Sequence, residues 1–247
     1  MTKATLVQIV ATASLLVLLA GCAGTSTAIS KRNLEVETRM TDTIFLDPVA
    51  HQNRTVFVQI RNTSDRSDLD IEQAVRAEVE ARGYRIVEDP SIARYWLQAN
   101  VLQAGVMSPS AAEQAYSGGF GSVIVGGATG AAAGAAVGDT ETAIVGGLIG
   151  AAVSTVVDSF VSDVTYTIVT DLQVSERVRD GIIITETVDH ELIQGTSGTT
   201  RQNSIRTTDW QRYQTRVVST ANKANLEFEE ASPDLVAGLT RSIAGIF

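Results

Sequence analysis

The residue best suited to chemistry in this sequence is Cys22, the one cysteine of the chain. It follows Leu19-Ala20-Gly21, and ahead of these lie the basic residue Lys3 and an uncharged apolar run from 4 to 19. A basic start, a short apolar run and small residues at the cut are typical of a secretory signal peptide. Cysteine directly after the cut is typical of a bacterial lipobox, so we expect cleavage after Gly21 and acylation of Cys22.

Acylation of Cys22 predicts a protein held on a membrane by covalent lipid and needing no other cofactor. Several acyl chains anchor a protein stably, whereas a single chain binds only marginally. The next residue is Ala23 and not aspartate, which favours the outer membrane. With Cys22 acylated, no thiol remains for a disulfide. The alternative is an ordinary signal peptide that happens to precede a cysteine.

The charge balance excludes nucleic acid as a partner. The formal net charge is -9, and nucleic-acid binding depends on Lys and Arg that neutralise phosphates. Catalytic motifs are equally absent from the sequence, since it has no nucleophile elbow, Walker loop, zinc-protease helix or paired cysteines. His51 and His190 are far apart in polar surroundings, which favours solvated side chains. We therefore expect neither an enzyme nor a metal site.

A glycine-rich stretch from 118 to 161 is the strongest pattern in the chain. Two uncharged runs, 118–138 and 143–157, flank the polar segment Asp139, Thr140, Glu141 and Thr142. Residues four apart stack on one face of a helix, so small residues at that spacing predict grooves in which two helices pack closely in lipid. The residues expected to line these grooves are Gly126, Gly130, Gly134, Gly138, Gly146 and Gly150.

The hydropathy of this stretch predicts a membrane helical hairpin with residues 139–142 as a surface-exposed tip. A helix over 122–137 would be about 24 Å long, short of a typical core of ~30 Å, but the outer membrane is thinner than average. The alternatives are a flexible Gly/Ala linker and a soluble helix pair. A linker would be more polar, and a soluble pair would show one polar face.

The remaining sequence predicts an α+β periplasmic domain interrupted by this Gly-zipper transmembrane hairpin. Alternating polarity favours strands over 54–61, 84–88, 93–103, 164–175, 181–188 and 212–220, with 181–188 paired to its predecessor. Apolar residues at helical spacing favour helices over 69–82 and after Ser232-Pro233. The expected parts are a signal peptide (1–21), the first part of the domain (22–117), the hairpin (118–161) and the second part (162–247).

Several segments resemble the TraT family of surface-exclusion and complement-resistance lipoproteins of conjugative plasmids. The similar segments span nearly the whole mature chain: 26–36, 54–65, 95–102, 194–198 and, most closely, 213–226. The resemblance implies an abundant, oligomeric outer-membrane lipoprotein exposed at the cell surface. Cells that carry such a protein are poor recipients in conjugation and resist complement.

From the resemblance and the small-residue grooves we expect a ring-like homo-oligomer that contacts outer-membrane lipid. Its outward partner would be the donor cell's mating apparatus or an outer-membrane protein. Two other functions remain open. One is a periplasm-facing structural lipoprotein of the envelope, and the other, less favoured, is a channel-forming oligomer, which would need a polar stripe along its lumen.

Overall fold

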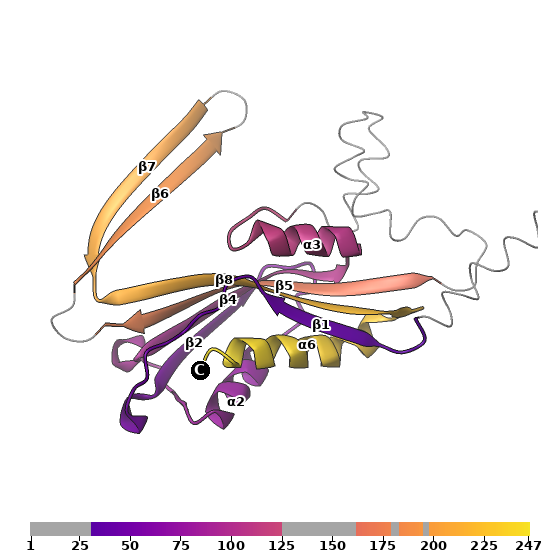
Figure 1. Ribbon diagram of the computed structural model, residues 1–247, viewed down its shortest axis with the longest axis horizontal. Coiled ribbons are helices and arrows are strands. Elements are labelled where there is room, and N and C mark those ends of the chain that lie inside the picture. The colour runs from indigo at the N-terminus through magenta and orange to yellow at the C-terminus, as the bar shows by residue number, and fades with distance from the viewer. Residues whose placement is uncertain (1–30, 125–161, 179–182, 195–197) are drawn as a thin grey trace, which may run out of the picture.

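The computed structural model describes residues 31–124, 162–178, 183–194 and 198–247, with backbone alone for 188–194 and 198–204. The centre of the body is a six-stranded sheet with the order β1-β8-β5-β4-β2-β3 (Figure 1). In that order its strands are Glu35–Met40, Trp210–Ala224, Asp163–Arg177, Tyr95–Val106, Thr55–Asn62 and Arg85–Ile86. β2 pairs in parallel with β3 and β4, and the other neighbours are antiparallel.

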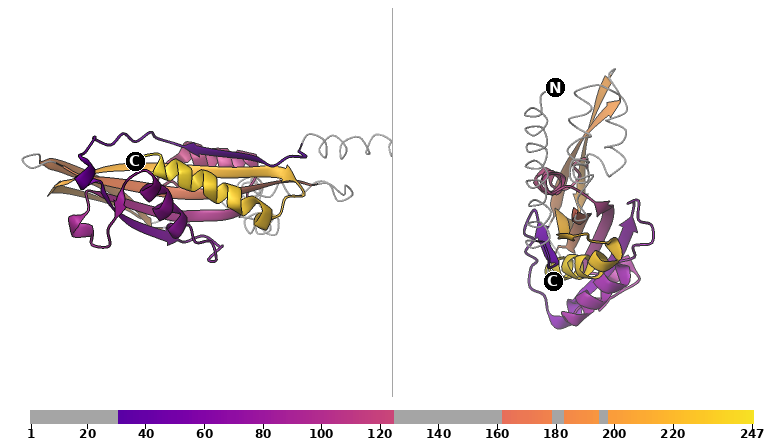
Figure 2. Two further views of the ribbon diagram at one scale, coloured as in Figure 1. Left: turned by 90° about the horizontal axis from the view of Figure 1, so that it is seen from below. Right: turned by 90° about the vertical axis from the view of Figure 1, so that its right-hand side faces the viewer.

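Helices lie on both faces of this sheet. α2 (Glu72–Ala81) and α6 (Phe228–Ala244) cover one face, and α3 (Pro109–Gly118) lies on the other (Figures 1 and 2). Two short 3-10 turns, η1 (His51–Asn53) and η2 (Pro90–Ile92), precede β2 and β4. The α2–α6 face is therefore closed, whereas α3 leaves much of the opposite face uncovered.

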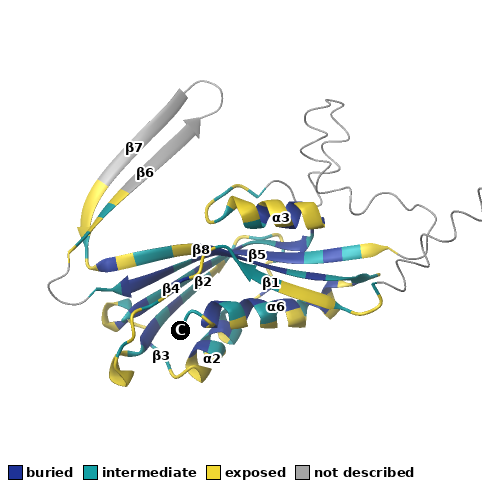
Figure 3. Cartoon of the chain, in the orientation of Figure 1, coloured by how far each residue is buried: buried dark blue, intermediate teal, exposed yellow. Residues whose placement is uncertain are grey.

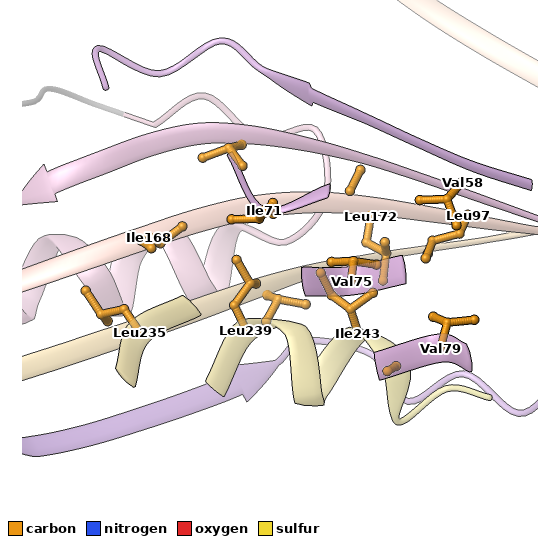
Figure 4. Close-up of a cluster of buried hydrophobic side chains, with 14 of the residues drawn as sticks. Val58, Ile71, Val75, Val79, Leu97, Ile168, Leu172, Leu235, Leu239 and Ile243 are labelled. Carbon is orange, nitrogen blue, oxygen red and sulfur yellow. The ribbon is translucent and has the colours of Figure 1, made fainter. Parts of the chain in front are cut away.

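The main core lies between the sheet and the α2–α6 layer. Alternate residues of the central strands point into it, because successive side chains of a strand face opposite sides. Figure 4 shows the apolar side chains of both helices against those of β2, β4 and β5, namely Ile71, Val75, Val79, Leu235, Leu239, Ile243, Val58, Leu97, Ile168 and Leu172. All of these are buried (Figure 3). A smaller cluster holds α3 to the other face through Ala111, Ala112 and Ala115 against Val169 and Val218.

A two-stranded arm projects from the end of the sheet where β5 ends and β8 begins. It consists of β6 (Ile184–Gln194) and β7 (Gly198–Thr208), which pair only with each other among the described strands. Figure 1 shows the arm rising away from the body on the side that carries α3. The prediction that 181–188 pairs with the preceding strand is therefore wrong, and the strand over 198–208 was not expected.

Most of the strands and one helix were predicted at the right places. The alternating segments over 54–61, 93–103, 164–175 and 212–220 correspond to β2, β4, β5 and β8, and the helix over 69–82 corresponds to α2. α2 ends where Gly83 takes φ +84, a conformation that favours glycine. The predicted start of the last helix at Ser232-Pro233 is wrong, because α6 begins at Phe228 and contains Pro233.

The fold class predicted from the glycine-rich stretch, a domain interrupted by a transmembrane helical hairpin, is also wrong. α3 ends at Gly118, and residues 119–124 form a loop instead of continuing into a helix. Gly119 and Gly121 take φ +68 and +74, which interrupts a right-handed helix. Among the described residues no helix has the length and apolar character needed to cross a membrane. The described chain is mainly β-sheet with three α-helices.

Candidate functional site

The uncovered sheet face is polar, in contrast to the apolar core on the other side. Gln59, Gln98, Gln173 and Gln214 lie opposite one another on β2, β4, β5 and β8. Their amides form a chain of hydrogen bonds in which each Nε2 donates to the next Oε1, at 2.9, 3.2 and 2.8 Å from Gln214 to Gln59. We call this the glutamine row. It leaves at least one N–H and one oxygen lone pair per amide for other contacts.

A buried ion pair lies beside the glutamine row, two residues further along β5 and β8. Arg216 has no exposed surface and Asp171 is 9% exposed. The Nε of Arg216 lies 2.6 Å from Oδ1 of Asp171, and its NH2 lies 3.1 Å from Oδ2, so the pair is bidentate. Such a fork-to-carboxylate arrangement fixes the orientation of both side chains.

The same arginine fastens the loop that follows α3. Its NH1 donates to the Ala115 carbonyl at 3.1 Å and to the Ser122 hydroxyl at 2.6 Å, and its NH2 donates to the Ser122 carbonyl at 3.0 Å. The Asp171 carboxylate accepts from the Gly121 N–H at 2.8 Å. We call this group, formed by Arg216, Asp171, Gly121, Ser122 and the Ala115 carbonyl, the Arg216 clamp.

Every N–H of the Arg216 guanidinium has an acceptor within the clamp, since an arginine side chain carries five such donors. The bond to Ala115 also satisfies one of the carbonyls that a helix leaves unpaired at its C-terminus, where a positive charge is favourable. Gly118 permits the close return of the loop, because a Cβ there would collide with the Ser122 side chain. The clamp is therefore a positioning device for the segment that enters residues 125–161.

A cleft of about 290 Å³ opens between the clamp and the glutamine row. Its floor includes Gln98 and Gln173, and its sides include Arg61, Asn100 and Phe120. Phe120 is 38% exposed although it lies between the two positive-φ glycines of the clamped loop. Amide, guanidinium and aromatic groups together suit the binding of a polar partner more than the catalysis of a bond-breaking step.

The base of the arm is held to the body by charge. Glu186 of β6 accepts from Nε of Arg206 on β7 at 2.7 Å and from NH1 of Arg212 on β8 at 2.6 Å. The hydrogen bond from Arg206, with the charges of Arg212 and Arg206, holds the pKa of Glu186 below its usual value. This carboxylate therefore stays ionised in mildly acidic solution and keeps the arm tied to β8.

The residues singled out from the sequence lie elsewhere. Cys22, the glycines at 126, 130, 134, 138, 146 and 150, and the predicted tip 139–142 all lie outside the described residues. His51 is exposed in η1. No group of acidic, histidine or cysteine side chains in the described part of the chain is arranged to hold a metal ion.

Asp171 and Arg216 were not predicted as functional residues, although the sequence around them carries a signal. Val169 and Val218 lie two residues from the charged pair, on the same faces of β5 and β8, and both are buried. A charge two positions from a buried valine, in two strands that pair, is the pattern of a buried ion pair.

Fold and site together define a class of protein: a sheet-dominated body with one polar sheet face and a long insertion whose first end is fastened by a buried ion pair. The model of the Enterobacterial TraT complement resistance protein family matches residues 33–247. The chain belongs to the TraT family, as the resemblance of its sequence segments predicted.

Relatives that carry the family's name match this chain over nine tenths or more of their length. A TraT complement resistance protein of Escherichia coli strain K12 is 43% identical over 247 residues, which covers 100% of both chains. The protein of the same name from Wigglesworthia glossinidia brevipalpis is 28% identical over 231 residues, 93% of this chain and 91% of that one. The PelC dodecamer from Paraburkholderia phytofirmans matches with a TM-score of 0.28 at 12% identity, over 85% of this chain and 95% of that chain, too weakly to carry an argument.

Proposed function

We propose that this chain is an oligomeric, lipid-anchored outer-membrane protein that acts in surface exclusion and complement resistance. The observation that carries the proposal is the 43% identity to a TraT complement resistance protein over the whole of both chains. The lipobox at Cys22 supports anchoring, since acylation there holds the chain on the membrane. In this proposal the protein acts by binding and shielding and not as an enzyme, and it has no cofactor besides the covalent lipid.

The arm is the feature that supports self-association. A two-stranded hairpin alone is only marginally stable in water, and three or more strands or packing against another element make it stable. Among the described residues, the arm's strands pair only with each other, and Ile183 and Ile205 at its base are 73% and 71% exposed. In the oligomer that we propose, the arm of one subunit packs on the body of its neighbour and covers these side chains.

Mating tests the exclusion part of the proposal. Plasmid-free recipients that produce the full chain are mated with donors of a plasmid that encodes it, beside recipients with an empty vector. We expect fewer transconjugants with the chain present, and better survival of the same cells in serum. The matched control is Cys22→Ser, which removes the lipid anchor and should restore transfer. Equal transfer with and without the chain would overturn the exclusion part of the proposal.

Surface labelling tests the location. With Cys22 acylated, a cysteine introduced as Thr140→Cys or as Gln73→Cys on α2 is the one free thiol. We expect a maleimide too large to enter the periplasm to label the Thr140→Cys variant in intact cells and to spare the Gln73→Cys variant. Labelling of both variants only after the outer membrane is breached would indicate instead a structural lipoprotein that faces the periplasm.

A further inference from the structure

A second cleft, of about 310 Å³, lies where β2 and β4 begin and β5 ends. Three arginines line it: Arg85 on the edge strand β3, Arg94 directly before β4 and Arg177 at the end of β5. The neutral polar side chains of Gln52, Asn53 and Ser91 complete its polar wall. No aspartate or glutamate of the described chain lines this cleft.

This gathering of arginines is unusual for a chain with a net charge of -9. Six described arginines outside the cleft meet carboxylates, as Arg39 does with Glu113 and Arg76 with Glu72. In the cleft only Arg94 does so, with Glu176 at 3.0 Å. Within the described residues, Arg85 and Arg177 form no ion pair. The cleft therefore carries uncompensated positive charge.

Two of the arginines are held in place before any ligand arrives. NH2 of Arg177 donates to the Ser91 carbonyl at 2.8 Å, and its guanidinium lies 4.7 Å from the centre of the Trp210 ring. Arg94 is fixed by Glu176. The Nε atoms of Arg94 and Arg177 are buried and find no acceptor among the described residues. The exposed carboxylate of Asp89 accepts a hydrogen bond from the Ser91 N–H at 2.8 Å.

We propose that this cleft binds a phosphoryl group. Guanidinium groups match the oxygens of phosphate in a planar, bidentate geometry, and a doubly charged oxyanion suits several arginines better than a single carboxylate does. Two pre-oriented arginines lower the entropy lost on binding. The exposed Arg85 on the edge strand β3 lines the cleft as the third arginine.

Tryptophan fluorescence gives a reporter within the site. The chain has two tryptophans, Trp96 and Trp210, with ring centres 4.4 Å apart, and Arg177 lies against Trp210. Inorganic pyrophosphate added to the full chain in detergent should change the emission saturably. Sodium chloride at the same ionic strength should not. Arg85→Gln and Arg177→Gln should each weaken binding by about tenfold, since a hydrogen bond to a charged group is worth roughly this much.

The matched control is Arg241→Gln, an exposed arginine of α6 that does not line this cleft and should leave binding unchanged. Calorimetry repeats the titration for Arg177→Gln, because that substitution also alters the surroundings of Trp210. A saturable signal lost in the Arg85→Gln and Arg177→Gln variants supports the proposal. No saturable signal, or equal affinity in Arg85→Gln and the parent chain, overturns it.

Vesicles distinguish a free phosphate compound from a lipid headgroup as the source of the group. The Cys22→Ser chain, which lacks the acyl anchor, is mixed with phosphatidylcholine vesicles with and without phosphatidic acid. Retention on the doped vesicles that Arg85→Gln abolishes assigns the cleft to a headgroup. Pyrophosphate binding without such retention assigns it to a soluble phosphate compound.

Discussion

At the scale of single residues, Arg216 shows how a fully buried charge is stabilised in the sheet. Burial of an ion pair costs desolvation of both groups, and the cost is offset only where geometry is good and the remaining donors are satisfied. Arg216 meets both conditions, because Asp171 binds it through two oxygens and Ala115 and Ser122 accept its other N–H groups. It follows that the clamp depends on all of its members together.

Removal of one partner of this pair should be strongly destabilising. Arg216→Met leaves Asp171 buried without a counter-charge, and we expect a loss of about 3–5 kcal/mol in the free energy of unfolding, measured in urea. Adding Asp171→Leu should recover part of it, since no unpaired charge then remains. Ser122→Ala, a milder change, should cost about 1–3 kcal/mol. The surface variant Arg61→Gln should change the free energy of unfolding by no more than about 0.5 kcal/mol. If Arg216→Met had an effect as small as that, the role of the clamp would be contradicted.

The raised pKa of Tyr95 predicts that the stability of the fold decreases at alkaline pH. Burial, with the charge of Glu176, raises the pKa of Tyr95 to about 12, and its hydroxyl donates to the Asp47 carbonyl at 3.0 Å. Because the folded pKa is above the unfolded value of about 10, the stabilisation is complete below pH ~10 and is lost as the pH rises toward 12. The free energy of unfolding, measured by denaturation at a series of pH values from 9 to 12, should fall less steeply with pH for Tyr95→Phe than for the parent chain. Parallel curves would contradict this.

At the scale of elements, the contact of α6 with the sheet depends on one glycine. A Cβ at Gly238 would collide with the Thr38 hydroxyl of β1, which is hydrogen-bonded to the Ser219 hydroxyl of β8 at 2.8 Å. The helix therefore approaches the β1–β8 edge as closely as its backbone permits. The sequence pattern of inward Leu235, Leu239 and Ile243 predicted the buried face of this helix but not how closely it packs.

Filling this contact should separate helix and sheet. We expect Gly238→Ala to cost about 1–3 kcal/mol, the usual penalty for overpacking, although alanine favours helix formation. Thr38→Ala in the same chain should return much of this loss, since it removes the atom in the way. The check is thermal unfolding of both single variants and of the double variant. Additive losses would contradict a direct collision between these two positions.

The elements also show what a sequence can and cannot predict. Polar and apolar residues alternate along most of β2, β4 and β5, because one face of each is apolar, and these strands were predicted together with β8. A serine-proline pair marks a true helix start at Ser108-Pro109, where the Ser108 hydroxyl accepts from the Ala111 N–H. The same pair at Ser232-Pro233 lies within α6, because Phe228 is buried against Tyr166 and extends the helix backwards. Tertiary packing decided between two equal local signals.

The candidate site could not be predicted from the sequence for a related reason, since its residues are brought together only by tertiary structure. The uncharged glycine-rich runs predicted helices from residue 118 on. Residues 119–124, at the start of the first run, instead form a loop fixed by side chains from β5 and β8. Asp171 and Arg216 are 45 residues apart in sequence, so only the register of the two strands brings them together. The strand predicted over 181–188 overlaps β6, but its partner β7 was not predicted, because Ile205 is the one apolar residue of 198–208 and no alternation marks a strand there.

At the scale of the whole molecule, body and arm are separate units joined at a narrow base. β5 and β8 stay paired up to Arg177 and Trp210, and the Val178 N–H still donates to the Asp209 carbonyl at 2.8 Å. Beyond this point the described arm strands pair with each other alone. The body's core lies between the sheet and the α2–α6 layer, far from the arm (Figure 1).

Removal of the arm should leave the body folded and reduce self-association. Replacing residues 180–207 by a two-residue Asn-Gly turn closes the ladder where Val178 and Asp209 already meet. We expect an unchanged unfolding midpoint for the body and a smaller particle by light scattering in detergent. A matched chain with Ile205→Ser alone keeps the arm but removes one exposed apolar side chain, and it should associate at an intermediate level. Oligomers of unchanged size without the arm would contradict its role.

Both ends of the stretch from 125 to 161 are fastened to the same pair of strands. The clamp holds the first end at Asp171, and the second end is held at Ser162, whose N–H donates to the Asn225 side chain at 2.8 Å. Along the chain of β5 these points are roughly 30 Å apart, at about 3.3 Å per residue. Because both ends are fixed in this way, the length and the amino-acid sequence of the stretch can change while β5 and β8 fold as before. The sequence of the stretch can therefore vary without loss of the body's fold, provided that the clamp and the Ser162–Asn225 contact are kept.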